Sequence, residues 1–141
     1  MLERAQDVNE HMPTYVAGRV AEILNSQGLA VNGARILALG VSYKPDVGDV
    51  RESPALHTMQ ALYRQGAEVR FHDFFVDEVR LNGAMTRCVL DLDEELETAD
   101  VVLLLTPHSA YNLASIADRA HAVFDTRNAY GSERRENIIP L

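Results

Sequence analysis

The amino-acid sequence predicts a doubly wound α/β fold built on a mostly parallel sheet. From about residue 33 onward, short apolar segments alternate with segments whose apolar residues have helical spacing. The apolar segments are continuous, as in Val101–Leu105, which is typical of strands buried on both faces. Glycine, proline or a capping residue stands at most of the junctions. Together these observations predict a Rossmann-like domain with five to six strands, preceded by a linker helix.

Two helices are expected before the sheet. Residues 2–12 have helical spacing, and Met12-Pro13 interrupts them, because proline fits a first helical turn better than a helix interior. A second helix then runs from about Pro13 to Gln27, and Gly28 ends it. The apolar stripe of this helix consists of Val16, Val20, Ile23 and Leu24.

The first strand, helix and second strand of the sheet follow in order. The strand Ala34–Val41 leads through a loop to a helix that Ser53 caps, with Pro54 in its first turn. Gly66 ends this helix, and Glu68–Asp73 is expected to be the second strand.

A less regular part comes next. We interpret residues 74–85 as irregular, with room for one short helix, and Thr86–Leu90 as a short third strand of the sheet. A helix then runs from Asp91 to Thr98. It begins with a capping box, since Glu94 stands three residues after Asp91.

The last part of the chain completes the predicted sheet. Val101–Leu105 is the fourth strand, a helix covers about residues 113–120, Ala122–Asp125 is the fifth strand, and Glu136–Leu141 can add a last one. The expected spatial order is third, second, first, fourth, fifth. Ligands of such sheets bind outside the carboxyl ends of the strands, where the order reverses. The loops expected there are residues 42–53, 106–112 and 126–131.

Composition and charge exclude several classes of function. The net charge of −8 argues against a nucleic-acid partner, because no broad basic face is available. No apolar run approaches the roughly 18 residues of a membrane span, and the N-terminus has no signal-peptide core. Cys88 is the only cysteine, which favours an intracellular, cytoplasmic setting. Within its short predicted strand, Cys88 is more readily a buried small hydrophobe than a nucleophile.

Three cations fall on the expected ligand-binding edge of this acidic protein. Lys44 and Arg51 lie in the loop after the first strand, and Arg127 follows the fifth strand. Arginine offers a planar fork to two phosphate oxygens, lysine offers a point charge, and a helix N-terminus adds free amides. The alternative interpretation is that these cations pair with the nearby carboxylates of Asp46, Asp49, Glu52 and Asp125.

The sequence contains no recognised motif for catalysis, metal binding or dinucleotide binding. Gly40 is followed by Val-Ser-Tyr-Lys rather than by the rest of a G-x-G-x-x-G fingerprint, so the sheet should not bind a dinucleotide in the usual way by itself. His108 is the only histidine on the predicted edge, and we interpret it as a surface or helix-capping residue. The acidic run Asp91–Glu97 indicates a solvated helical face. We therefore expect no metal site and no catalytic residue.

The segment Gly40–Ala55, GVSYKPDVGDVRESPA in one-letter code, gives the most specific signal. It resembles the signature of the UDP-glucose/GDP-mannose dehydrogenase family, in the C-terminal, UDP-binding domain. The resemblance continues through Gly66–Asp73, Ala99–Thr106 and Phe124–Asn128 in the same order. Residues 7–20 are similar to the link between the central and C-terminal domains of that family. Within the family, these residues are most similar to the branch that oxidises UDP-N-acetylhexosamines.

The resemblance implies a function for a longer protein. Enzymes of this family are NAD-dependent and oxidise C6 of a nucleotide-sugar hexose to a carboxylate, in steps that use a catalytic cysteine and reduce two NAD. Residues 1–30 would be the end of a central linker helix, and residues 31–141 the C-terminal nucleotide-sugar-binding domain. The cysteine segment and the NAD fingerprint have no match here, and Cys88 does not match the catalytic cysteine. This chain alone is therefore expected to be inactive.

The resemblance also assigns binding residues. Tyr43, Lys44 and Arg127 match positions that contact the nucleotide sugar, and Arg51 matches a position that reaches the NAD pyrophosphate. The main NAD-binding domain would be elsewhere in the longer protein. That protein would be a homodimer or higher oligomer, of which this part alone could be a monomer.

Two other interpretations remain open at this point. The chain could be a stand-alone, non-catalytic nucleotide-sugar-binding module. It could also be an interaction domain of flavodoxin-like topology, in which the loop cations only pair with neighbouring acids.

Overall fold

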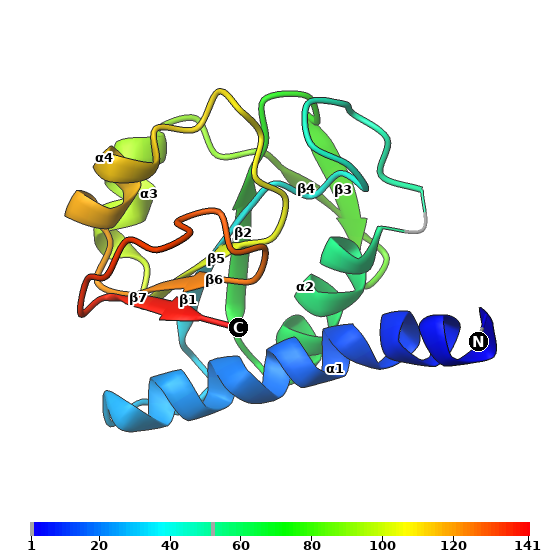
Figure 1. Ribbon diagram of the computed structural model, residues 1–141, viewed down its shortest axis with the longest axis horizontal. Helices are drawn as coiled ribbons and strands as arrows, with labels where there is room; N and C mark the ends of the chain where they lie inside the picture. The colour runs from blue at the N-terminus through cyan, green and yellow to red at the C-terminus, as the bar shows by residue number, and fades with distance from the viewer. Residues whose placement is uncertain (1, 52) are drawn as a thin grey trace.

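Figure 1 shows the computed structural model, which describes residues 2–51 and 53–141, with residues 2–12 described by their backbone alone. Five parallel strands form one sheet in the order β2-β1-β5-β6-β7. Their bounds are β1 Arg35–Leu39, β2 Glu68–His72, β5 Val101–Leu104, β6 Val123–Asp125 and β7 Ile138–Pro140. The order reverses between β1 and β5, so the doubly wound α/β prediction is confirmed.

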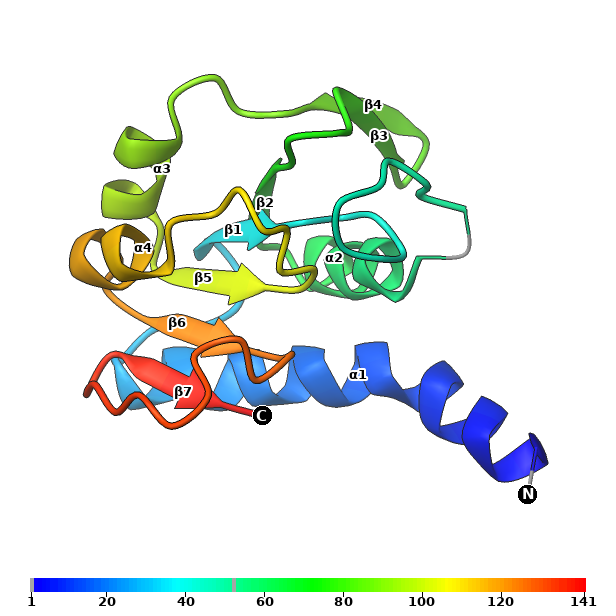
Figure 2. The ribbon, with the colours of Figure 1, turned by 45° about the horizontal axis from the view of Figure 1, so that its top comes forward.

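Helices cover both faces of this sheet (Figure 2). The helices α1 (Leu2–Ser26) and α2 (Pro54–Arg64) pack on one face, and α3 (Leu92–Thr98) and α4 (Leu113–Arg119) pack on the other. Alternate side chains of β1 therefore enter different cores. Ile36 belongs to the core beneath α1 and α2, whereas Leu37 belongs to the core beneath α3 and α4. Burial on both sides explains why the strands are continuously apolar.

The N-terminal part is one helix rather than two. Pro13 lies inside α1, so the predicted interruption at Met12-Pro13 is wrong. An internal proline removes one backbone hydrogen bond and bends a helix without necessarily ending it. Figure 2 shows the axis of α1 bending in its N-terminal part. The predicted apolar stripe of the second half is confirmed, since its side chains Val16, Val20, Ile23 and Leu24 are buried against the sheet.

The predicted third strand of the sheet is wrong. Residues 78–87 instead form an antiparallel hairpin of β3 (Glu78–Leu81) and β4 (Ala84–Arg87), separate from the main sheet. Asn82 and Gly83 join the two strands, both with positive φ angles of 48° and 85°. This is the geometry of a two-residue type I′ turn, for which Asn-Gly is the preferred sequence. The sequence therefore held a hairpin signal inside the segment interpreted as irregular.

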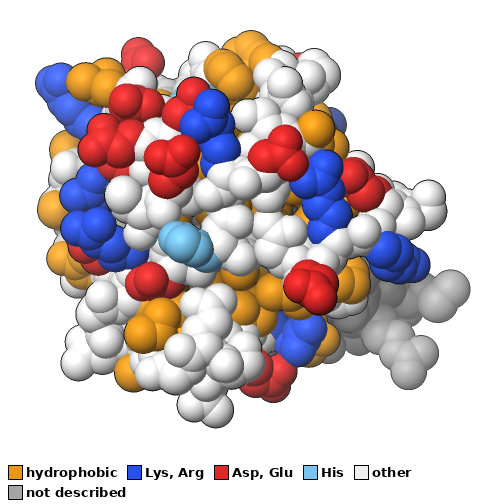
Figure 3. Space-filling model, turned by 90° about the vertical axis from the view of Figure 1, so that its left-hand side faces the viewer, with side chains coloured by type: hydrophobic (Ala, Val, Ile, Leu, Met, Phe, Trp, Pro, Cys, Tyr) orange, Lys and Arg blue, Asp and Glu red, His pale blue; other side chains and the backbone are white. Residues whose placement is uncertain are grey.

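The surface seen from the α3 and α4 side carries charges of both signs side by side (Figure 3). Ion pairs connect many of them: Arg119 with Asp93 and Glu97, and Arg135 with Asp118 and Glu133. This mixture agrees with the interpretation of the acidic run as a solvated helical face. Among residues 2–51 and 53–141, no helix has the length and apolarity that a membrane crossing requires.

A buried carboxylate connects the carboxyl ends of the central strands. Asp73 follows β2, and its Oδ2 accepts hydrogen bonds from the Val41 amide and from His108 Nε2, both at 2.8 Å. Its Oδ1 accepts the Phe75 amide at 2.7 Å. Both side chains of the Asp73–His108 pair are fully buried. Asp73 therefore joins the chain after β1, the turn after β2 and the loop after β5.

The end of β1 also approaches the chain after β5 very closely. Gly40 has a φ angle of 80°, and a Cβ atom there would lie 2.1 Å from the carbonyl oxygen of Thr106. Only glycine combines a left-handed backbone with such a close approach. This contact sets how near the two ligand-edge loops lie to one another.

We predict that Gly40→Ala lowers the free energy of unfolding by at least about 3 kcal/mol, because left-handed strain adds to the overlap with Thr106. The matched control is Gly28→Ala, where φ is 76° and the added Cβ meets nothing within 4 Å. Strain alone should cost this variant about 1–2 kcal/mol. Urea unfolding compares the two, and equal losses would show that the approach to Thr106 is unimportant.

We also predict that Asp73→Asn costs about 3 kcal/mol of unfolding free energy. In either orientation of the asparagine amide, its NH₂ group faces a group that donates to the Asp73 carboxylate, so two donors face each other and a hydrogen bond is lost. Asp77→Asn, four residues along the chain and exposed, is the control and should change stability by less than about 0.5 kcal/mol. Indistinguishable denaturation midpoints for the two variants would contradict the role of Asp73.

Candidate functional site

The loop between β1 and α2 is closed by its own backbone. The Tyr43 amide donates to the Asp49 carbonyl at 2.7 Å, and Ser42 Oγ donates to the Lys44 carbonyl at 2.9 Å. Within this closed loop the side chains of Tyr43 and Lys44 are exposed. Tyr43 keeps half of its surface accessible, so its ring is free to contact a ligand.

The loop after β5 holds the middle of the β1–α2 loop. The backbone of Asp46 is left-handed, with a φ angle of 64°. Its amide donates to His108 Nδ1 at 2.7 Å, and its Oδ1 accepts from the amide and hydroxyl of Ser109 at 2.8 and 2.9 Å. The Ser109 hydrogen bonds lower the pKa of the Asp46 carboxyl. The carboxylate of Asp46 is thus used to fix one loop to another.

The third loop of this edge presents Arg127. Asp125, the last residue of β6, is buried and accepts the amides of Arg127, Ala129 and Tyr130 at 3.0–3.1 Å. The guanidinium of Arg127 donates to the Leu105 carbonyl at 3.1 Å, and the side chain remains exposed. The backbone turn after β6 therefore aims Arg127 towards the chain after β5.

Hydrogen bonds connect the three loops into one edge. Arg127 bonds to Leu105, the next residue Thr106 donates its hydroxyl to the Ser42 carbonyl at 2.7 Å, and Ser42 precedes Tyr43 and Lys44. In Figure 2 the loops after β1 and β5 lie at the arrowheads of those strands. The structure thus brings the predicted substrate-contacting residues to the same edge of the sheet, where the predicted ligand-binding loops meet.

The alternative pairing with nearby acids holds for one of the three cations. Arg51 pairs with Asp49, at 3.2 Å between Nε and Oδ1, and this guanidinium lowers the pKa of Asp49. Asp46 and Asp125 bind backbone amides instead, and Glu52 lies outside the described residues. Within the described part of the chain, no carboxylate lies within 4 Å of the charged groups of Lys44 or Arg127. Lys44 is also the only lysine of the sequence.

Ser53 stands at the N-cap position of α2, as predicted, but it does not cap the helix. Its hydroxyl donates to the Val41 carbonyl at 2.7 Å and makes no bond to the first turn. Pro54 occupies the first helical turn. The predicted helix start is confirmed, and the serine side chain instead fastens the helix to the end of β1.

His108 lies in a different environment from the predicted one. The prediction of a surface or capping histidine fails, because His108 is only 2% exposed and bonds to Asp73 and Asp46. Its burial depends on two partners that are 35 and 62 residues away in the sequence. The signal that could have found the pair is topological: Asp73 follows β2 and His108 follows β5, and both strands flank β1.

Cys88 lies just after β4 and is partly buried. Burial raises the pKa of its thiol, and Sγ contacts the backbone of Asp73. A protonated, packed thiol is a poor nucleophile, which agrees with the structural interpretation. Across the described ranges, no three or more His, Cys, Asp and Glu side chains gather in a way that could hold a metal ion.

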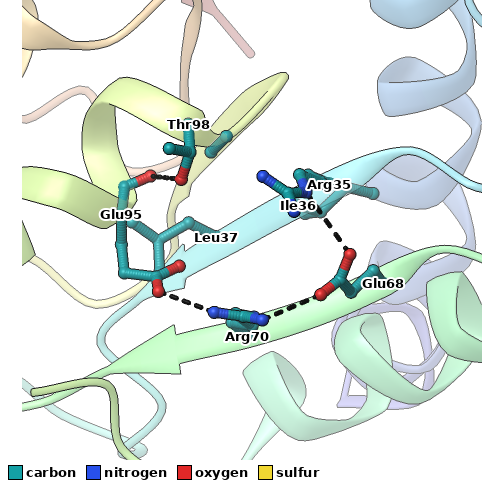
Figure 4. A pocket seen from close by; sticks show the side chains of 8 residues that line it. Arg35, Ile36, Leu37, Glu68, Arg70, Glu95 and Thr98 are labelled. Carbon is teal, nitrogen blue, oxygen red and sulfur yellow. Dashed lines mark hydrogen bonds and ion pairs between the residues drawn. The ribbon is translucent and has the colours of Figure 1, made fainter.

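A hollow at the opposite end of the sheet does not belong to this site. It lies where β1 and β2 begin, under α3, and Figure 4 shows Arg70 bridging Glu68 and Glu95 across it. The two distances are 2.9 and 2.7 Å, and Arg35 lies 3.5 Å from Glu68. Both carboxylates raise the pKa of Arg70. Both arginines of this hollow are already paired with carboxylates, unlike Lys44 and Arg127 on the loop edge.

Comparison with known proteins agrees with this geometry. The family model described as "UDP-glucose/GDP-mannose dehydrogenase family, UDP binding domain" matches residues 37–132, which include all three loops. The sequence is 31% identical over 133 residues to Protein CapL of Staphylococcus aureus. It is 30% identical over 131 residues to the UDP-N-acetyl-D-mannosamine dehydrogenase of Escherichia coli K12. These alignments cover 89% and 86% of this chain, but only 31% and 30% of the relatives.

Solved structures agree with the same assignment. The UDP-D-ManNAc dehydrogenase of Pyrococcus horikoshii superposes with a TM-score of 0.79 at 27% identity, over 96% of this chain and 32% of that one. The UDP-N-acetyl-mannosamine dehydrogenase Cap5O of Staphylococcus aureus gives a TM-score of 0.71 at 28% identity, over 95% and 31%. The chain spans about a third of the length of these proteins. It belongs to the UDP-glucose/GDP-mannose dehydrogenase family and corresponds to the UDP-binding domain of that family.

Proposed function

We propose that this chain is the nucleotide-sugar-binding domain of an NAD-dependent UDP-sugar 6-dehydrogenase. The whole enzyme oxidises the C6 hydroxyl of a UDP-N-acetylhexosamine or UDP-hexose to a carboxylate, with two NAD reduced and water consumed. The relatives named UDP-N-acetyl-D-mannosamine dehydrogenase favour the N-acetylhexosamine as the substrate class. An enzyme of this kind would supply uronic acids for surface polysaccharides.

The observation that carries this proposal is that two cations on the loop edge are exposed and are not paired with a described carboxylate. Lys44 and Arg127 stand exposed, and among the described residues no carboxylate lies within 4 Å of either charged group. A diphosphate would give both cations an anionic hydrogen-bond partner, whereas the described residues give Arg127 only the neutral carbonyl of Leu105. Tyr43, exposed beside Lys44, adds an aromatic surface for the nucleoside or the sugar.

NAD would be held mainly by another part of the enzyme. In dinucleotide-binding sheets, the glycines after the first strand let the cofactor pyrophosphate approach the backbone. Here the space next to Gly40 is filled by the Thr106 carbonyl, which does not fit that kind of cradle. Arg51, whose side chain is 88% exposed, is the residue that we assign to the NAD pyrophosphate across the domain boundary. NAD, when bound, supplies the hydride acceptor.

We assign residues 1–30 to the end of a central linker helix and residues 31–141 to the ligand-binding domain. The apolar stripe in the second half of α1 is buried in the core that it shares with α2, so movement of this helix would carry the whole domain with it. The complete enzyme would be a cytoplasmic homodimer or higher oligomer. Within these 141 residues Cys88 has no second cysteine to pair with, which agrees with that compartment.

We predict that Lys44→Ala and Arg127→Ala each weaken binding of UDP by about 10- to 100-fold. Each removes a charge-assisted contact to phosphate, which is worth about 1.5–3 kcal/mol. Amide chemical shifts of the 141-residue chain, followed during titration with UDP, give the dissociation constants and should move near Lys44 and Arg127.

The control for these variants is Arg64→Ala, which removes an exposed cation from the other end of α2. It should leave the affinity for UDP unchanged. Shifts that appear only outside the three loops, or equal weakening by all three substitutions, would contradict the assignment of the site.

A second prediction uses the fact that Lys44 is the only lysine. Acylation of its amine at limiting reagent should slow in the presence of saturating UDP, because a phosphate contact buries the amine and keeps it protonated. Peptide mass spectrometry measures the rate. The N-terminal amine serves as the internal control. Equal rates at Lys44 with and without UDP would remove Lys44 from the site.

A further inference from the structure

We propose that His108 is the positioning residue of the β1–α2 loop. Its Nδ1 accepts the Asp46 amide and thereby fixes the turn that presents Tyr43 and Lys44. This inference rests on the proposed function for its consequence in ligand binding, but its structural claim can be tested without any ligand.

The hydrogen-bond partners of His108 define one tautomer. Nδ1 lies 2.7 Å from the Asp46 amide nitrogen, which can only donate, so Nδ1 must be the acceptor. Nε2 then carries the proton, which it donates to Asp73 Oδ2 at 2.8 Å, with Ser42 Oγ at 3.3 Å as a second acceptor. The imidazole is neutral in this arrangement. The two ring nitrogens therefore differ in role, since Nε2 joins the core and Nδ1 holds the loop.

The ring is also held in place by its neighbours. The Phe75 ring lies at 4.9 Å between centroids and the Tyr111 ring at 5.9 Å, and the Asp73 carboxylate accepts three donors in all. The charged groups that face the imidazole are Asp73 from the end of β2 and Asp46 from the loop, whose Oδ1 lies 4.0 Å from Nδ1. A fixed ring gives Nδ1 a fixed position in space.

The loop needs such a fixed acceptor. Asp46 has left-handed φ, which a residue other than glycine adopts at a cost in free energy. Its side chain is held by Ser109 and its amide by His108, two consecutive residues after β5. Lys44 lies two residues before Asp46 in the same closed loop. Loss of the bond to Nδ1 would free the turn, and the Lys44 amine would then sample more positions.

Two substitutions separate the roles of the two ring nitrogens. In His108→Asn, the amide oxygen can take the place of Nδ1 and accept the Asp46 amide, but the donor to Asp73 is lost. In His108→Gln, the amide nitrogen can take the place of Nε2 and donate to Asp73, but no acceptor remains for Asp46. We therefore expect the two variants to rank in opposite order for stability and for ligand binding. His108→Gln has the higher free energy of unfolding, whereas His108→Asn keeps the loop conformation and the ligand affinity.

The measurements are urea unfolding, hydrogen exchange of the Asp46 amide, and titration with UDP. Exchange at Asp46 should rise about tenfold or more in His108→Gln, and UDP affinity should fall by a similar factor. His108→Asn should stay within about threefold of the unmodified chain in both. His121→Gln, an exposed histidine, is the control and should match the unmodified chain. A purely structural role would instead make loop protection, affinity and stability fall in the same order, which would overturn the proposal.

If either variant does not fold, a measurement on the unmodified chain tests whether His108 Nδ1 accepts the Asp46 amide. Nitrogen NMR should show the Nε2–H tautomer and a coupling through the hydrogen bond between the Asp46 amide and Nδ1. An Nδ1–H tautomer without that coupling would overturn the inference. If the unmodified chain does not bind UDP, the proposed function fails, while exchange and coupling still decide the role of His108.

Discussion

The buried hydrogen bond between Asp73 and His108 is the constraint on which the ligand edge depends. Asp73 takes donors from the chain after β1, from the turn after β2 and from the loop after β5, three segments that are distant in sequence. A buried carboxylate is tolerated only when its acceptors are satisfied, so these segments cannot move independently. His108 in turn accepts the Asp46 amide, so the same hydrogen-bond network also holds the loop that carries Lys44.

The same use of carboxylates shapes the electrostatics of the edge. In a chain with a net charge of −8, Lys44 and Arg127 would be expected to find acidic partners. The acids nearest in sequence are occupied, because Asp46 accepts from Ser109 and Asp125 accepts from three backbone amides. Asp46 and Asp125 therefore build the loops instead of neutralising Lys44 and Arg127. This arrangement keeps positive charge available for a phosphate ligand, which is the premise of the proposed function.

Local patterns predicted most of the fold and the position of two cations of the candidate site on one edge of the sheet. Continuous apolar runs identified the strands of the parallel sheet, and the resulting topology placed Lys44 and Arg127 on one edge. The helix continues through Pro13, against the local prediction, because burial of the apolar stripe that follows outweighs the cost of a proline inside a helix. The hairpin does have a local signal in the sequence, since Asn82-Gly83 is the preferred pair for its turn. The burial of His108 had no local signal, since its environment comes from β2 and the β1–α2 loop.

Gly40 illustrates how a familiar sheet can carry a different kind of ligand site. In dinucleotide-binding sheets the glycines after the first strand admit a cofactor to the backbone. Here the missing side chain admits the Thr106 carbonyl, so the loops after β1 and β5 close on each other. The amides of Gly40, Val41 and Tyr43 already donate to His72, Asp73 and Asp49. Under the proposed function, the exposed side chains of the closed loop take a main part in recognition, so the position of Lys44 matters for affinity. Hence a buried histidine that never touches the ligand can govern its affinity.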